Sequence, residues 1–255
     1  MIEDTDGDEL SHRDRGIRAL ADETYEAAGD AYATAARSAL AGNGPAGSSA
    51  YDDRARSRAG DALGAYAVAA VCRRLRAGPD SVPDRARAHV AEGIVVAGEL
   101  RDHVLEASVE RAACHEFVGD LRAVIGDEDR ASDAYDRAAE AYAACDLDSP
   151  AAETGRPFLQ AGTELLAHLS RPDDVGWDDL HGSGNGALAR RVRVKRSRTA
   201  SAADARVRAG RLHAPRGSTE YNTGRFRCPE CGSDDVNYVA GTTLCLRCST
   251  PTDRT

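Results

Sequence analysis

Apolar residues recur every three or four positions through much of residues 11–170, which places them on one face of an α-helix. In the first such stretch, Ile17, Leu20 and Tyr32 share a face with a run of alanines. Ser11 suits the N-cap, because a serine hydroxyl can accept a backbone N–H of the first turn. The pattern therefore predicts one helix over residues 11–40, followed by a flexible Gly/Pro/Ser turn at 42–49.

The same periodicity continues after this turn and is interrupted by glycine and proline. Gly78 and Pro79 end the second helical stretch in the usual order, and Pro83 opens the third. Further helices are expected over residues 52–76, 83–105, 109–124, 130–144 and 158–169.

One pair of these helices has a distinctive distribution of small and aromatic residues. Residues 115–142 contain Val118-Gly119 in one helix, Gly126 at the turn, and Ala131, Tyr135 and Ala138 in the next helix. This succession resembles the tetratricopeptide repeat, although the early Trp and the closing Pro of that family are absent. The resemblance implies a helical hairpin in which a small residue lets the second helix pack closely. Alanine-rich antiparallel helices of no particular family would give much of the same pattern.

After residue 170 the chain becomes polar and then basic. Residues 190–227 have many arginines and few apolar side chains, so we expect residues 171–224 to form a flexible linker that cannot bury a core. Arginines in such a segment can contact nucleic-acid phosphates, or they can solvate a tether that lies against an acidic body. The candidate nucleic-acid-binding residues are Arg190, Arg191, Arg193, Lys195, Arg196, Arg198, Arg225 and Arg227.

Two C-x-x-C pairs near the C-terminus carry the strongest chemical signal. Cys228-Pro-Glu-Cys231 and Cys245-Leu-Arg-Cys248 each direct two thiolates at one point, and together they form the tetrahedral set typical of structural zinc. Between the pairs, residues 236–239 and 242–244 are β-prone and Ala240-Gly241 can turn. We therefore predict a zinc ribbon over residues 225–250 that binds one Zn²⁺, with no coordination position open to a substrate. The ribbon is similar to those of archaeal TFIIB-type transcription factors, which implies its fold and does not extend to the helical region.

Composition supports a mainly α protein. Alanine is abundant, whereas the chain has only three Phe, one Trp and one Met. The net charge is −9 and Lys195 is the only lysine, a composition that resembles proteins of salt-loving archaea and favours solubility. The acidic N-terminus lacks the pattern of a signal peptide, and no apolar stretch is long enough for a membrane span. The scattered Cys72, Cys114 and Cys145 do not form a disulfide framework, so we expect a reducing cytoplasm.

Candidate catalytic groups do not assemble into a recognisable motif. Glu99/His103 and Glu164/His168 have i,i+4 spacing, whereas carboxylate-bridged metal bundles use Glu-x-x-His. The glycine-rich stretch 182–186 has no preceding strand and no following Lys-Ser/Thr pair, so a spacer is expected there. The sequence therefore predicts no enzyme and no small-molecule substrate.

These observations predict an acidic disordered N-terminus (1–10), an antiparallel helical domain (11–170), the linker, the ribbon and a short tail (251–255). The expected function is that of an adaptor, in which the helices bind a protein partner and the ribbon contacts a second macromolecule. The alternative is a regulator that binds DNA or RNA, or a ribonucleoprotein, through the ribbon and the basic linker.

Overall fold

The computed structural model describes residues 10–42, 53–171, 180–181 and 184–255, with side chains described from residue 58 onward in the second range. The predictions for the N-terminal residues 1–9, for the turn at 43–49 and for the polar residues 172–179 lie outside this description.

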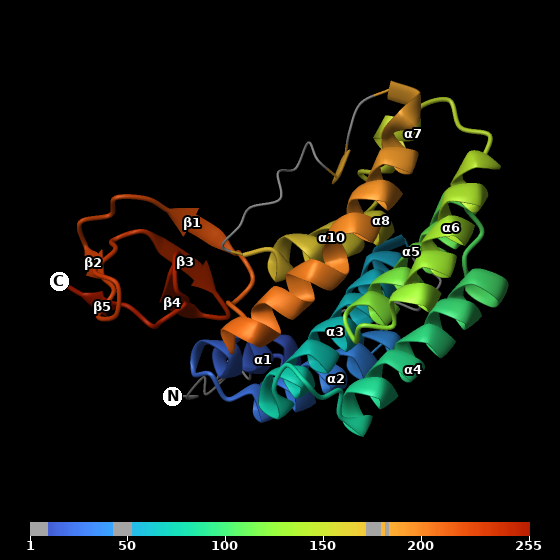
Figure 1. Ribbon diagram of the computed structural model, residues 1–255. Helices are drawn as coiled ribbons and strands as arrows, with labels where there is room; N and C mark the ends of the chain where they lie inside the picture. Colours follow the sequence, from blue (N-terminus) through green and yellow to red (C-terminus); the bar gives the residue numbers. More distant parts are fainter. Residues whose placement is uncertain (1–9, 43–52, 172–179, 182–183) are drawn as a thin grey trace, which may run out of the picture.

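Most of the described chain is helical, as predicted, and a small β region follows at the C-terminal end (Figure 1). Consecutive helices from α1 to α6 pack against one another, α8 packs on α3, and α10 contacts α5, α6 and α8. The helices are α1 (His12–Ala21), α2 (Tyr25–Leu40), α3 (Asp53–Ala77), α4 (Asp84–Glu99) continued by the π-helical turn η1 (Leu100–Val104), α5 (Ser108–Ala123), α6 (Glu128–Ala143), α7 (Pro150–Glu153), α8 (Pro157–Leu169) and α10 (Ala187–Ala209), which the 3₁₀ turn η2 (Gly184–Gly186) precedes.

The single helix expected over residues 11–40 is two helices, so this prediction is wrong. Glu23 has a φ of 55°, and the amide of Thr24 donates to the carbonyl of Ala19 at 2.9 Å, which closes α1 with a tight turn. The apolar periodicity survives the break because both helices face the same core, with Ile17 and Tyr32 buried. The predicted N-cap is confirmed, since the Ser11 hydroxyl accepts the amide of Asp14 at 3.1 Å.

Helices α5 and α6 form the helical hairpin that the small-residue pattern predicts. A β-carbon placed on Gly119 would lie 2.7 Å from Cδ1 of Tyr135, so the Tyr135 ring needs glycine at this position. The Tyr135 hydroxyl then reaches Asp120 and donates to its carboxylate at 2.7 Å. The close approach of the two helices thus positions a buried polar contact as well as apolar surface.

The prediction of a flexible linker over residues 171–224 is wrong for residues 187–209, which form the helix α10. This helix has 23 residues and is capped by Gly210, which has the left-handed conformation (φ 67°) common at helix C-termini. Leu188, Val192 and Val207 supply a sparse apolar stripe on its inner face. The same face also carries the charged residues Arg191, Lys195 and Arg206, which explains why apolar periodicity alone did not identify the helix.

The C-terminal region contains two small antiparallel sheets. One has the strand order β1-β3-β4 and the other pairs β2 with β5. The predicted hairpin is confirmed, because Ala240 and Gly241 both have positive φ (53° and 63°), as a two-residue type I′ turn requires. The strands are β1 (Ser218–Glu220), β2 (Phe226–Arg227), β3 (Val236–Val239), β4 (Thr242–Cys245) and β5 (Asp253–Arg254), so the ribbon extends beyond residues 225–250.

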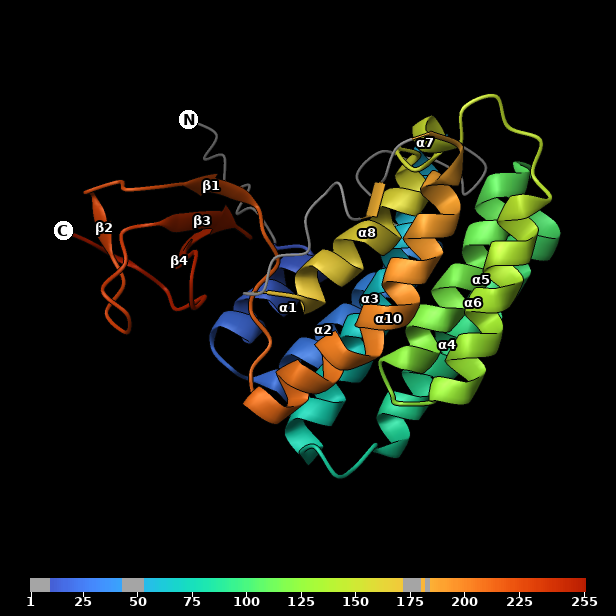
Figure 2. The same ribbon diagram turned by 45° about the horizontal axis from the view of Figure 1, so that its top comes forward.

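The ribbon, defined here as residues 218–254, lies against one end of the helical body beside α1 (Figures 1 and 2). Arg18 of α1 donates from Nε to the carbonyl of Ala240 at 3.0 Å and from Nη2 to that of Gly241 at 3.3 Å. Leu244 is fully buried in the same apolar cluster as Leu20 and Leu212. The sequence predicts a ribbon on a flexible linker, whereas the tip of its β3–β4 hairpin packs into the helical body.

Candidate metal centre and buried ion-pair network

The first cysteine pair forms a tight knuckle at the end of β2. The amide of Cys228 donates to the carbonyl of Ser233 at 2.8 Å, and the amide of Gly232 donates to that of Cys228 at 3.0 Å. Gly232 has a φ of 71°, a conformation that glycine adopts without a steric cost. The amide of Cys231 points toward the Cys228 sulfur at 3.5 Å. This knuckle is turned outward, since residues 229–232 are exposed.

The second pair forms the same knuckle without a glycine. The amide of Ser249 donates to the carbonyl of Cys245 at 2.9 Å, and Ser249 has a φ of 61°. A non-glycine residue in this conformation costs about 1–2 kcal/mol. The Ser249 side chain offsets part of this cost, because its hydroxyl accepts the amide of Ala214 at 3.0 Å. Serine thus occupies the position that Gly232 has in the first knuckle, and its side chain contacts the chain that leads into the ribbon.

The two knuckles bring all four sulfur atoms together. The Sγ atoms lie 3.4 Å apart for Cys228 and Cys248, 3.5 Å apart for Cys231 and Cys245, and 3.7 Å apart for Cys231 and Cys248. All four lie within 4.8 Å of one another, and all four cysteines are free thiols. A tetrahedral ion with metal–sulfur bonds of about 2.3 Å requires sulfur atoms about 3.8 Å apart. The cluster therefore fits one tetrahedral metal ion.

The four thiols differ in their exposure to solvent. Cys228 and Cys245 are buried, Cys248 is half-buried and Cys231 is exposed. Burial raises the pKa of the Cys245 thiol, so a cation is needed to hold it as a thiolate. Within the described residues, this cluster is the only group of three or more close His, Cys, Asp or Glu side chains that could hold a metal.

The candidate nucleic-acid-binding residues do not form one surface. On α10, Arg191 and Lys195 are fully buried, whereas Arg190, Arg193, Arg196 and Arg198 are exposed. The carboxylate of Asp136 on α6 holds Arg196. On the ribbon, Arg225 pairs with Glu220 at 2.6 Å, and Arg227 donates to the carbonyl of Gly232 at 3.2 Å. For Arg191 and Lys195 the prediction is wrong, because no solvent-exposed ligand can reach them.

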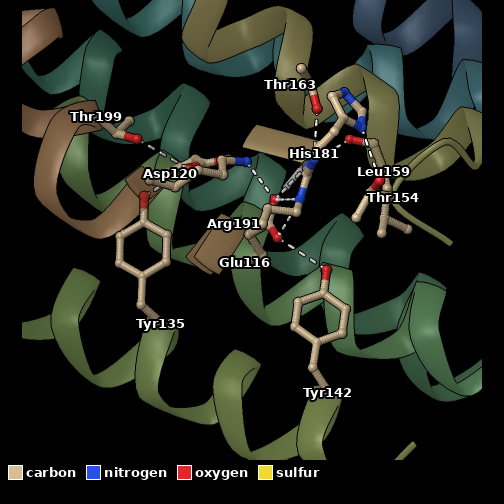
Figure 3. Close-up of polar contacts among 11 residues, drawn as sticks. Glu116, Asp120, Tyr135, Tyr142, Thr154, Leu159, Thr163, His181, Arg191 and Thr199 are labelled. Atoms are coloured by element: carbon tan, nitrogen blue, oxygen red, sulfur yellow. Dashed lines mark hydrogen bonds and ion pairs between the residues drawn. The ribbon is translucent and has the colours of Figure 1, made fainter. Parts of the chain in front are cut away.

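Two of the buried cations of α10, Arg191 and Lys195, meet two buried carboxylates of α5 (Figure 3). Arg191 Nη2 lies 2.8 Å from Glu116 Oε1, and Lys195 Nζ lies 2.6 Å from the same oxygen. Lys195 Nζ also lies 2.5 Å from Asp120 Oδ2. Each of the four side chains is at most 1% exposed, so the charges balance one another inside the protein.

Neutral groups form additional hydrogen bonds with the charged side chains of this ion-pair network. The hydroxyl of Tyr142 donates to Glu116 at 3.0 Å, and Arg191 donates to Thr163 Oγ1 and to the carbonyl of Leu159, both at 2.6 Å. Burial would raise the pKa of Glu116, but the cations of Arg191 and Lys195 lower it to about 2. Burial raises the pKa of Asp120, because Lys195 only partly opposes that effect.

The network depends on matched helical spacing and on one glycine. Glu116 and Asp120 are four residues apart, as are Arg191 and Lys195, so each pair lies on one helix face. Helix α8 crosses beside them at Gly162, where a β-carbon would lie 2.7 Å from Lys195 Nζ. The i,i+4 spacing and the single lysine were visible in the sequence, but nothing local indicated that the two pairs would meet.

The Glu/His pairs considered in the sequence do not build a second metal site. Glu99 and His103 lie 3.8 Å apart and are exposed. His168 is buried, and its Nε2 donates to the carbonyl of His213 at 2.7 Å, whereas Glu164 is exposed. His168 thus serves as a contact between α8 and the chain that enters the ribbon.

Acid should destabilise the protein through His168. Burial, together with nearby Arg171 and Arg13, lowers the pKa of His168 to about 4, so the imidazole is neutral in the folded state. In the unfolded chain the His168 imidazole binds a proton below pH ~6.5, whereas in the folded protein it does so only below pH ~4. The stabilisation is complete above pH ~6.5, and we expect a loss of about 3 kcal/mol as the pH falls from ~6.5 to ~4. Urea unfolding at pH 7.5 and pH 4.5 measures this loss.

The matched variant for this prediction is His168→Gln, whose amide can still donate to the carbonyl of His213. Its free energy of unfolding should depend less on pH than that of the unchanged protein. An equal dependence in the two proteins would show that His168 does not titrate as expected.

None of the helices in the described part of the chain is both long and apolar enough to cross a membrane. Comparison with known proteins gave no match, neither to a family model, nor to a curated sequence, nor to a solved structure.

Proposed function

We propose that this chain is a cytoplasmic, non-enzymatic scaffold that binds a protein partner on its helical body and carries a zinc ribbon docked beside it. The observation that carries the proposal is the fixed position of the ribbon, which Arg18 and the buried Leu244 hold against the helices. One rigid unit can present two surfaces to partners in a constant orientation. The Gly119–Tyr135 packing supports a tetratricopeptide-like origin for the helical surface.

The donor set supports zinc as the metal. Four thiolates in a tetrahedral arrangement suit Zn²⁺, and they leave no position for a substrate or a reactive water. The ion would be held by Cys228, Cys231, Cys245 and Cys248 and would stabilise the fold. Cys72, Cys114 and Cys145 are free thiols, which supports a reducing compartment.

A groove in the helical body supports the partner-binding role. It has a volume of about 550 Å³, opens between α2, α3 and α8, and extends to Pro215 before the ribbon. Its lining contains small residues and charged side chains of both signs. Such a lining admits the backbone of a partner segment closely, while the charges can fix its orientation. The small lining residues are Ala35, Ala39, Ala62, Gly64, Ala65, Ala161 and Ala167.

Charge favours a protein partner over a nucleic acid at the ribbon. Residues 218–254 contain four arginines and five acidic residues, so the ribbon is not basic. The α10 cations that gave this region its basic composition include two that neutralise buried carboxylates. Electrostatic attraction to phosphates, the main source of nonspecific nucleic-acid affinity, is correspondingly small.

A pull-down at molar salt, with and without nuclease, tests the proposal. We expect protein partners that survive nuclease and that are lost when Ala65→Arg fills the groove. Ala88→Arg, an exposed position on α4, is the matched control and should retain them. A Cys228→Ser/Cys245→Ser variant identifies the partners that need the ribbon. If nuclease removes every partner, a nucleic-acid-binding regulator replaces the scaffold.

A further inference from the structure

The second cysteine knuckle is both half of the metal site and the surface that contacts the helical body. Residues 245–249 begin at the last residue of β4 and carry Cys245 and Cys248. The carbonyl of Leu246, between these two ligands, accepts a hydrogen bond from the guanidinium of Arg171 at the end of α8. The hydroxyl of Ser249, directly after the last ligand, accepts the amide of Ala214. Both contacts are buried.

Arg171 connects this knuckle to the rest of the helical body. Its guanidinium also donates to the carbonyl of Ala214, and its own carbonyl accepts from Arg206 of α10. Arg171 is 3% exposed. One buried cation thus joins α8, α10, the chain before the ribbon and the peptide between two metal ligands.

The first knuckle has the opposite arrangement. Residues 229–232 are exposed, and the hydrogen bonds of Cys228 within the described chain are to other residues of the ribbon. A metal ion would therefore tie an outward knuckle to an inward one that the helices already hold in shape.

We propose that metal binding and docking of the ribbon are thermodynamically coupled, so that the helical body raises the metal affinity of the four cysteines. The contacts of Arg171 and Ala214 with residues 246 and 249 favour the conformation of the second knuckle that the metal requires. A half-site whose conformation is favoured in this way loses less conformational freedom on binding than an unrestrained one. Because coupling is reciprocal, the metal must also strengthen docking, and its loss must weaken the contact of the ribbon with α1 and α8.

Zinc titration of the full chain against a competing chelator tests this coupling. The inference rests on the metal assigned in the proposed function and not on the partner. The test variants are Arg18→Met and Arg171→Met, which remove contacts from the body side and alter no metal ligand. Arg37→Met removes an arginine that pairs with Glu92 at 2.7 Å, away from the ribbon, and serves as the control. Circular dichroism first establishes that each variant keeps its helices.

We expect the zinc dissociation constant to rise about tenfold or more in Arg18→Met and in Arg171→Met, and to stay unchanged in Arg37→Met. Wild-type affinity in both docking variants would overturn the coupling. If the unchanged chain binds no zinc, the metal assignment itself fails, which is a separate result.

A second measurement needs no variant. Hydrogen exchange of the unchanged protein with and without zinc follows the amide of Ala214, which belongs to the chain before the ribbon and is held by Ser249. Faster exchange at Ala214 in the metal-free protein supports the coupling. Equal protection in the two states, while the ribbon amides lose theirs, contradicts it.

Discussion

Removing the metal ion is expected to unfold the ribbon while the helices α2–α8 remain folded. The ribbon has few buried apolar side chains, among them Phe226, Val236 and Leu246, which is too small a core to fold unaided. Metal binding in comparable small modules contributes about 10–16 kcal/mol. Without the ion no bond holds the four sulfur atoms together, and burial raises the pKa of Cys245, which favours its neutral thiol form.

The measurement is hydrogen exchange across the whole chain after chelation, together with far-UV circular dichroism. Amides of β3 and β4 should lose protection, and the helical signal should change little. Cys228→Ser should reproduce this result without a chelator. Cys145→Ser is the control, since a serine there can keep the hydrogen bond that the thiol donates to the carbonyl of Ala141. A ribbon that stays protected after chelation would show that β-sheet and docking contacts suffice to fold it.

Replacing Arg191 with methionine is expected to destabilise the helical body by about 3–5 kcal/mol. The substitution leaves Glu116 and Asp120 with one cation between them, and it removes the donors to Thr163 and to the carbonyl of Leu159. A buried charge without a partner costs more than the lost attraction alone, because it cannot be solvated. Urea unfolding at neutral pH measures the change.

Arg193→Met is the matched control for this prediction. Arg193 lies two residues along the same helix but is exposed, so its loss should change stability by no more than about 0.5 kcal/mol. A double variant, Glu116→Leu with Arg191→Met, should be more stable than Arg191→Met alone, because it leaves Lys195 paired with Asp120. Equal destabilisation by Arg191→Met and Arg193→Met would contradict the role assigned to the network.

The comparison of Arg191 with Arg193 also separates a structural role of an arginine from a role in binding. Arg191 and Arg193 were both candidates for nucleic-acid contact, and only Arg193 is accessible. The contrast explains how a basic stretch can be misread. The number of arginines indicates charge, whereas the packing of the helix decides which of them face inward.

Local patterns in the sequence determined much of this protein. The helical periodicity, the Ser11 cap, the Ala240-Gly241 turn and the two cysteine knuckles each depend on residues a few positions apart. Such features can be predicted because the interactions that form them lie within one or two turns of chain. Even there, the three-residue turn that separates α1 from α2 was missed, because both helices bury the same side and the apolar pattern passes through it unchanged.

Only the tertiary structure decided the roles of α10 and of the ribbon's inner face. The inner face of α10 carries Arg191 and Lys195, which are 75 and 79 residues away from Glu116 in the chain. This face can be buried only because Glu116 and Asp120 supply the opposite charge. The docking of Ser249 likewise depends on Ala214, 35 residues earlier. A polar residue is stable inside a protein when a partner meets it there, and packing brings together partners that are distant in the sequence.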